Sequence, residues 1–165
     1  MLGIKSLAPG KTGVLVLVLI LLVCILLARN SHTLMRFMVG QEINLKTANF
    51  NEIQTTHFRI KYLPVDEAYI DLIAASVEDA YSSVSSVFGE EPAGLTTVVV
   101  YPDSTSLAKS FGWDKDEKAM GVYWGGTIRI LSPGVWASGP DITQQFMEEG
   151  PIVHEFTHLM VDETT

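Results

Sequence analysis

An uninterrupted apolar run near the N-terminus constrains this chain more than any other feature. Residues 14–28 are fifteen residues without a charge, almost all of them Val, Leu and Ile. That length suits either the hydrophobic region of a secretory signal or a short membrane-spanning helix. The end of the run offers one small residue, Ala28, where a cleavage site needs two. We therefore expect an uncleaved anchor, with a cleaved signal as the alternative.

The charges on either side of the run predict its orientation. Lys5 and Lys11 precede it, so residues 1–13 are expected to form a cytoplasmic tail, with the rest of a single-pass protein outside the cytoplasm. From residue 30 onward there are 8 Lys+Arg and 19 Asp+Glu, a net charge of −11. Such an acidic domain is a poor partner for nucleic acid. Cys24 lies within the apolar run, so no disulfide can stabilise the domain, which must depend on a hydrophobic core.

Beyond the run, hydrophobic periodicity and turn residues predict alternating strands and helices. Residues 29–56 are polar overall and predict a juxtamembrane spacer, with a mildly amphipathic helix over 31–39. Strands are expected at 57–62 and 95–101, a long helix at 66–88 ending at Gly89, and a short helix at 104–111. Segments 120–124 and 127–131 predict a hairpin around Gly125-Gly126, and 132–140 a loop. Asp141 and Gln144 resemble a capping box, and Gly150-Pro151 either kinks the following helix or starts a new one.

The segment 154–158 reads His-Glu-Phe-Thr-His, the H-E-x-x-H pattern. Residues four apart lie on one face of a helix, so His154 and His158 can bind one metal ion from the same side. Neutral imidazole is a good Zn²⁺ ligand, and Glu155 can accept a proton from water beside such an ion. The pattern therefore predicts a zinc site with a general base.

The sequence around the motif supports a helix with an apolar back and a polar front. At 100° per residue, one stripe collects the apolar side chains and the opposite side carries both histidines. The apolar stripe comprises Ile152, Val153, Phe156, Leu159 and Met160. Asp162 continues the histidine stripe one turn further, about 6 Å of rise, too far for its short side chain to reach the same metal. It is expected to hydrogen-bond a ligand imidazole or nearby backbone.

The motif as it stands, HEFTHLMVD, resembles the thermolysin-type segment, and the order of elements from about residue 57 is similar to the N-terminal half of gluzincin metallopeptidases. The resemblance implies an α+β, zincin-like subdomain over 57–165, with a mixed sheet and the active-site helix at its C-terminal end. It implies zinc on His154 and His158, with Glu155 as catalytic base in peptide-bond hydrolysis. It also implies that strand 120–124 aligns an extended peptide substrate. Tyr123 and Trp124 on this strand are candidate substrate contacts, with packing in the core or the hairpin as the alternative.

Gluzincins take a third ligand, a Glu, from a helix beyond the motif, whereas seven residues follow His158 here. The expectation is therefore a truncated peptidase domain, inactive by itself, whose third ligand lies beyond residue 165. The alternatives are a non-catalytic ectodomain that acts as a binding module, or an inactive fragment with an incomplete metal site.

Overall fold

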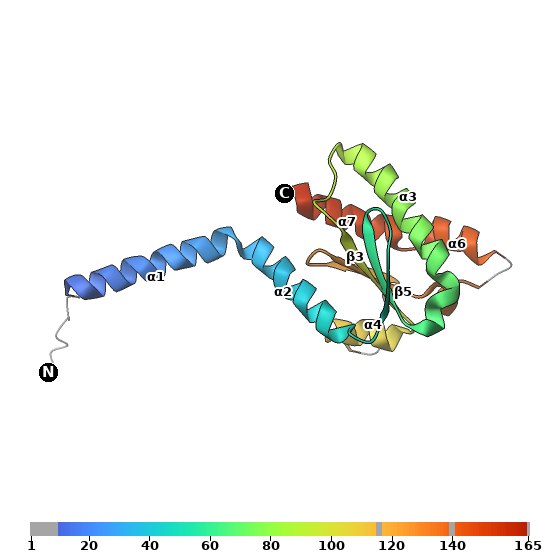
Figure 1. Cartoon of the computed structure of the whole chain (residues 1–165), viewed down its shortest axis with the longest axis horizontal. Coiled ribbons are helices and arrows are strands. Elements are labelled where there is room, and N and C mark those ends of the chain that lie inside the picture. The colour runs from blue at the N-terminus through green and yellow to red at the C-terminus, as the bar shows by residue number, and fades with distance from the viewer. Residues whose placement is uncertain (1–9, 115–116, 139–140, 165) are drawn as a thin grey trace. The chain divides into compact units, whose positions relative to one another are not determined.

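The computed structural model of the chain describes residues 10–114, 117–138 and 141–164, and divides into two compact units, residues 1–38 and 39–165. In the first unit, helix α1 (Lys11–Arg29) contains the apolar run (Figure 1). Its segment Thr12–Arg29 has a mean hydropathy of 2.8 and none of it is buried. The helix is therefore long and apolar enough to cross a membrane, and a signal sequence would have the same properties.

The second unit begins earlier in the sequence than residue 57. Helix α2 (Ser31–Lys46) is longer than expected, and Val39 and Ile43 on it are buried. Strand β1 (Asn51–Gln54) then pairs with the next strand. The prediction of a polar spacer over 29–56 is therefore wrong for residues 39–54. The segment is polar overall, but Val39 and Ile43 are one helical turn apart and are buried, and the edge strand β1 is largely exposed.

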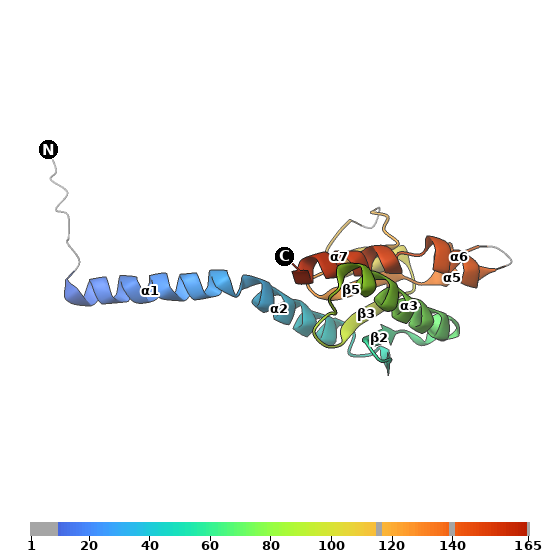
Figure 2. The same cartoon turned by 90° about the horizontal axis from the view of Figure 1, so that it is seen from above.

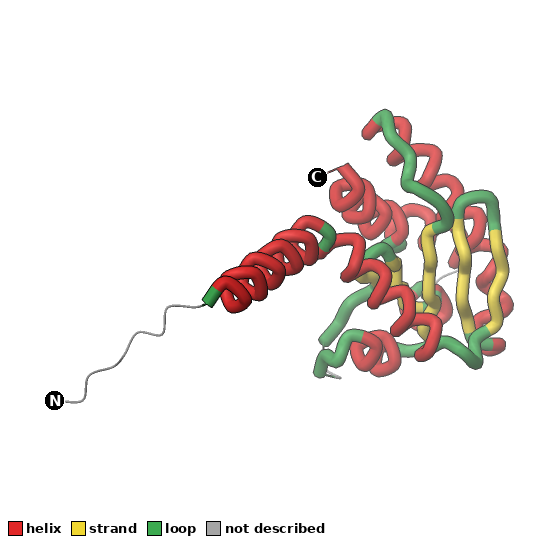
Figure 3. The backbone as a smooth tube through the Cα atoms, turned by 60° about the vertical axis from the view of Figure 1, so that its left-hand side comes forward, coloured by secondary structure: helices red, strands yellow, loops and turns green. Residues whose placement is uncertain are grey.

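Five strands form one mixed sheet in the order β1-β2-β3-β5-β4. Figure 3 shows the strands in yellow. Strands β2 (Phe58–Tyr62), β3 (Thr96–Tyr101) and β5 (Thr127–Leu131) are parallel. β1 and β4 (Gly121–Trp124) run antiparallel at the two edges. The three central strands and the hairpin confirm the sequence prediction. Both turn residues, Gly125 and Gly126, have positive φ (55° and 83°), as a two-residue type I′ turn requires.

The helices largely follow the predicted pattern. Residues 66–88 begin as a 3₁₀ turn, η1 (Pro64–Tyr69), and continue as α3 (Ile70–Phe88), which ends at left-handed Gly89. Helix α4 (Ser104–Ser110) agrees with expectation, while the predicted loop 132–140 contains a short helix, α5 (Pro133–Trp136). Residues 139 and 140 lie outside the described residues.

The two faces of the sheet carry separate cores. Figure 2 shows α3 and α7 (Ile152–Thr164) together on one side of the strands. On that face Phe58, Ile60, Val98, Ile128 and Ile130 pack against both helices. On the opposite face Val99, Tyr101 and Leu131 pack against α4 and the C-terminal half of α2. The observed fold is thus an α+β fold in which both faces of the sheet are covered.

An interruption between helices α6 (Ile142–Glu149) and α7 at Gly150-Pro151 sets where α7 begins. Helix α6 begins at Asp141, whose carboxylate accepts the Gln144 N–H at 2.9 Å. Gly150 is extended, and the Pro151 carbonyl accepts the Glu155 N–H at 2.9 Å. Gly150-Pro151 therefore starts a new helix instead of kinking an existing one, because Pro lacks the N–H that would continue α6.

Candidate metal centre

Helix α7 presents the two motif histidines to solvent and buries its apolar face. Both imidazoles are exposed, whereas Ile152, Phe156, Leu159 and Met160 are buried against α3 and the sheet. Val153 departs from the prediction and is 48% exposed. The buried arc of the helix is shifted away from Val153 and toward Glu155, because β4 covers the Glu155 side.

The two imidazoles are already placed as a pair. The His154 Nε2 and His158 Nε2 atoms lie 3.1 Å apart, and the ring planes meet at 80° with centroids 4.7 Å apart. Two nitrogens bound at about 2.0–2.1 Å to one tetrahedral Zn²⁺ would be separated by about 3.3 Å. The observed spacing therefore fits two ligands of a single zinc ion.

Glu155 lies between the helix and the sheet edge. Its side chain is only 6% exposed, and Oε2 accepts a hydrogen bond from the backbone N–H of Tyr123 at 2.7 Å. A carboxylate buried in this way needs such a donor, and the N–H that β4 turns away from β5 supplies it. The carboxylate is thus held beside the edge strand, one residue from the first imidazole.

Gly121 permits this close approach of strand and helix. A Cβ atom at that position would lie 2.6 Å from Pro151 Cβ and 2.9 Å from Glu155 Cγ. Any larger residue would push β4 away from the start of α7. Sequence reasoning missed Gly121, because nothing in a hairpin sequence says which glycine faces a helix.

Tyr123 links the strand to the end of the same helix. Its hydroxyl donates a short hydrogen bond to Asp162 Oδ2 and accepts the Gly126 N–H at 3.2 Å. Asp162, expected to support an imidazole or backbone, therefore supports the hairpin through this tyrosine.

The two candidate substrate contacts separate, because side chains alternate along a strand. Tyr123 faces α7, whereas Trp124, 51% exposed, lines a cavity on the other face of the sheet. Of the two, only Tyr123 contacts helix α7.

Within the described ranges, no group of three or more His, Cys, Asp or Glu side chains is gathered to hold a metal ion. The centre consists there of two imidazoles and a neighbouring carboxylate.

His57, which immediately precedes β2, contacts two side chains of α3. Its Nδ1 lies 2.6 Å from Glu78 Oε2, its backbone N–H donates to Glu78 Oε1 at 2.9 Å, and its ring stacks on Tyr81 with centroids 3.6 Å apart. Burial raises the pKa of Glu78, but hydrogen bonds from Thr55 and His57 outweigh it and leave the pKa below its usual value. This cluster ties β2 to α3.

Comparison with protein-family models finds no match to this chain, and comparison with curated proteins finds no relative. Any functional conclusion therefore depends on the geometry and on the motif.

Proposed function

We propose that this chain belongs to a membrane-attached zinc peptidase of the gluzincin type, acting outside the cytoplasm. The observation that carries the proposal is the histidine pair, with its nitrogens 3.1 Å apart and a carboxylate beside an antiparallel edge strand. The order of elements adds support, since a mixed sheet with an antiparallel edge strand, β4, beside a motif-bearing helix resembles the upper half of a zincin.

His154 and His158 would hold the zinc through their Nε2 atoms. When bound, zinc lowers the pKa of a coordinated water and polarises a substrate carbonyl. Glu155 then has a proton-transfer role. The Tyr123 N–H occupies and orients Oε2, which leaves Oε1 to accept a proton from the attacking water and to deliver it to the leaving amine.

Catalytic zinc usually has three protein ligands. The third would come from outside the described residues, as the resemblance to gluzincins implies. The edge strand β4 would align an extended peptide through its outward-facing backbone groups.

The N-terminal helix would keep the domain at the membrane. Lys5 and Lys11 favour an inside N-terminus, and the apolar segment is followed directly by Arg29. Membrane fractionation followed by N-terminal sequencing tests this point. We expect an intact N-terminus in the membrane fraction, whereas a soluble product starting after Ala28 would establish a cleaved signal.

The competing function is a non-catalytic binding module. It is favoured by the Tyr123 N–H bond, which occupies one oxygen of the Glu155 carboxylate, and by the presence of two imidazoles but no third ligand among the described residues. Zinc binding and catalysis must therefore be tested separately.

The first experiment measures zinc affinity of the full chain in a nanodisc by competition with a chromophoric chelator. We expect weak, one-to-one binding that His158→Ala abolishes and Glu155→Gln preserves, because only the former removes a ligand. Unchanged zinc in His158→Ala would refute the metal centre.

The second experiment measures chelator-sensitive cleavage of quenched fluorescent peptides by the product of the natural gene, purified from its own membrane. Glu155→Gln at the chromosomal site should lower cleavage by about 10²-fold or more while zinc is retained. Zinc retention without any cleavage in the unaltered protein would support the binding-module alternative. Robust cleavage by residues 1–165 alone would indicate that a third ligand lies within them, for which Asp162 is the candidate.

A further inference from the structure

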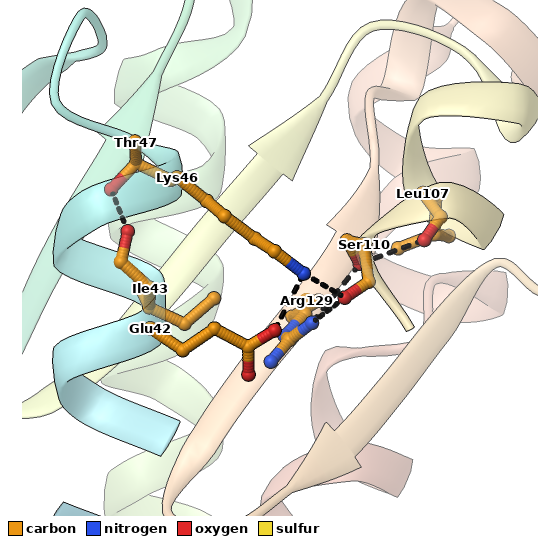
Figure 4. A network of polar contacts seen from close by, with 7 residues as sticks. All are labelled: Glu42, Ile43, Lys46, Thr47, Leu107, Ser110 and Arg129. Carbon is orange, nitrogen blue, oxygen red and sulfur yellow. Dashed lines mark hydrogen bonds and ion pairs between the residues drawn. The ribbon is translucent and has the colours of Figure 1, made fainter. Parts of the chain in front are cut away.

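A second polar site lies on the sheet face opposite α7. Its centre is Arg129 on β5, which is 1% exposed although it is a long charged side chain. Arg129 Nη1 donates to the Ser110 carbonyl at 2.7 Å and to Ser110 Oγ at 3.2 Å, both at the C-terminal end of α4 (Figure 4). One face of the guanidinium covers the Phe111 ring, with Cζ 4.2 Å from its centroid.

The guanidinium is not fully hydrogen-bonded within the part of the chain that the structure describes. Arg129 Nε is buried there without a hydrogen-bond partner. Burial lowers the pKa of Arg129, while Tyr101 and Glu42 act in the opposite direction. A buried donor left unsatisfied is costly, and such a donor beside a cavity is where a ligand oxygen gains most.

The nearby charges leave Arg129 as the net positive group. Glu42 is paired with Lys46 at 2.5 Å, and each of these side chains is 44% exposed. Lys46 also donates to the Ser110 carbonyl at 3.1 Å, so it lies on the same side as Arg129 (Figure 4). The pKa of Glu42 is lowered, first by its hydrogen bond with Lys46. The Glu42–Lys46 pair is thus neutral as a unit, and an approaching anion meets the charge of Arg129.

The cavity beside Arg129 has the size and walls for one small ring. Its volume is about 220 Å³, and Phe111, Trp113, Val122 and Trp124 form its apolar wall. A cavity of about 150 Å³ is enough to bind benzene in a protein interior. Trp113 and Trp124 are 43% and 51% exposed, so two large aromatic surfaces at the mouth are open to a ligand.

We propose that this cavity binds a small organic carboxylate with a single aromatic or flat apolar group. The carboxylate accepts hydrogen bonds from the Nε edge of Arg129, and the ring contacts Trp113 and Trp124. The site is separate from the histidine pair and does not depend on the proposed peptidase activity, because it lies on the other face of the sheet.

The probe pair is phenylacetate and its neutral isostere phenylacetamide. The full chain in a phosphatidylcholine nanodisc, labelled with ¹⁵N-tryptophan, gives three indole N–H signals that Trp→Phe variants assign. Phenylacetate should produce saturable shifts at Trp113 and Trp124 but not at Trp136, which packs on Phe146. Phenylacetamide should bind about tenfold more weakly or worse, because it cannot form the charge-assisted hydrogen bond.

Variants test the two halves of the site. Arg129→Met should remove the preference for the anion, and Trp124→Ala should weaken both ligands. Arg59→Met is the matched control, since Arg59 is on β2 and pairs with Glu52 at 3.1 Å. It should leave binding unchanged.

Equal binding of the acid and the amide, absence of a saturable shift, or an equal shift at Trp136 would each overturn the proposal. If Arg129→Met fails to fold, the comparison of acid with amide on the unaltered chain still decides.

Discussion

The two faces of the sheet differ in how far their buried charged side chains are hydrogen-bonded. On the α7 face the core is apolar, the histidines point to solvent, and the buried acid Glu155 accepts a backbone N–H. On the α2/α4 face a buried cation, Arg129, has a nitrogen without a partner among the described residues. The first face owes its stability to packing, whereas the second bears an electrostatic cost. A ligand oxygen of the kind proposed above would satisfy this nitrogen and offset part of that cost.

The largest expected effect is on the α7 face. Phe156 is fully buried, and its ring lies 5.7 Å from Phe58 and 5.8 Å from Tyr81. Phe156→Ala should lower the free energy of unfolding by about 4 kcal/mol, measured by urea denaturation of the full chain in detergent. Leu107→Ala, in the core of the other face, is the comparison and should cost about 3 kcal/mol. If Leu107→Ala lowered the free energy of unfolding more than Phe156→Ala does, the α2/α4 face and not the α7 face would depend more on packing.

The next effect tests the contact between β4 and α7. Gly121→Ala places a methyl group against Pro151 and Glu155 and should cost about 2 kcal/mol by overpacking. Gly40→Ala is the control: Gly40 lies in α2 with no atom within 4 Å of an added Cβ, so it should gain up to about 1 kcal/mol. If the two variants have equal free energies of unfolding in urea, β4 has room for a methyl group beside Pro151 and Glu155, which would contradict the overpacking argument.

A smaller effect concerns Asp66 in η1, which is 3% exposed and whose Oδ2 lacks a partner among the described residues. Burial raises its pKa above the usual 3.8, and a hydrogen bond with Ser132 only partly opposes this. The folded state therefore favours the protonated acid. Its stabilising contribution is complete below pH 3.8 and is lost as the pH rises through the raised pKa.

Asp66→Asn should consequently gain stability relative to the unaltered chain between about pH 3.5 and 7, by about 1 kcal/mol in urea titrations. Asp103→Asn is the control of opposite sign. The hydrogen bonds from Ser106 lower the pKa of Asp103, so this variant should lose relative stability over the same range. If the stability of both variants relative to the unaltered chain changed with pH in the same direction, the opposite pKa shifts of Asp66 and Asp103 would be contradicted.

The smallest expected effect is that of Arg129→Met, which tests directly whether the buried cation on the α2/α4 face stabilises the fold. Arg129→Met loses the two hydrogen bonds to Ser110 but also removes a desolvation cost, so the free energy of unfolding should stay within about 1 kcal/mol of the unaltered value. Lys46→Met, which breaks an exposed pair, should change it by about 0.5 kcal/mol or less. A loss of about 3 kcal/mol or more from Arg129→Met would assign the arginine a structural role.

Much of the fold could be predicted from local pattern. The central strands alternate or run apolar, α3 has clear helical spacing, and Gly125-Gly126 marks the hairpin. Residues 39–54 could not be placed, because α2 carries only Val39 and Ile43 as its buried residues, and β1 is largely exposed. In the candidate metal centre, the histidines and Glu155 could be predicted because they lie within one five-residue segment, 154–158.

The sequence by itself determined the apolar N-terminal helix, the α+β order of elements and the histidine spacing, since each depends on residues near one another in the chain. The tertiary structure decided that Glu155 bonds to Tyr123, that Gly121 lies against Pro151, and that Tyr123 and Trp124 face opposite ways. It also brought Glu42, Ser110 and Arg129 together from three separate segments. Contacts of this kind follow from how strands pair and helices cover them, which short-range periodicity does not specify.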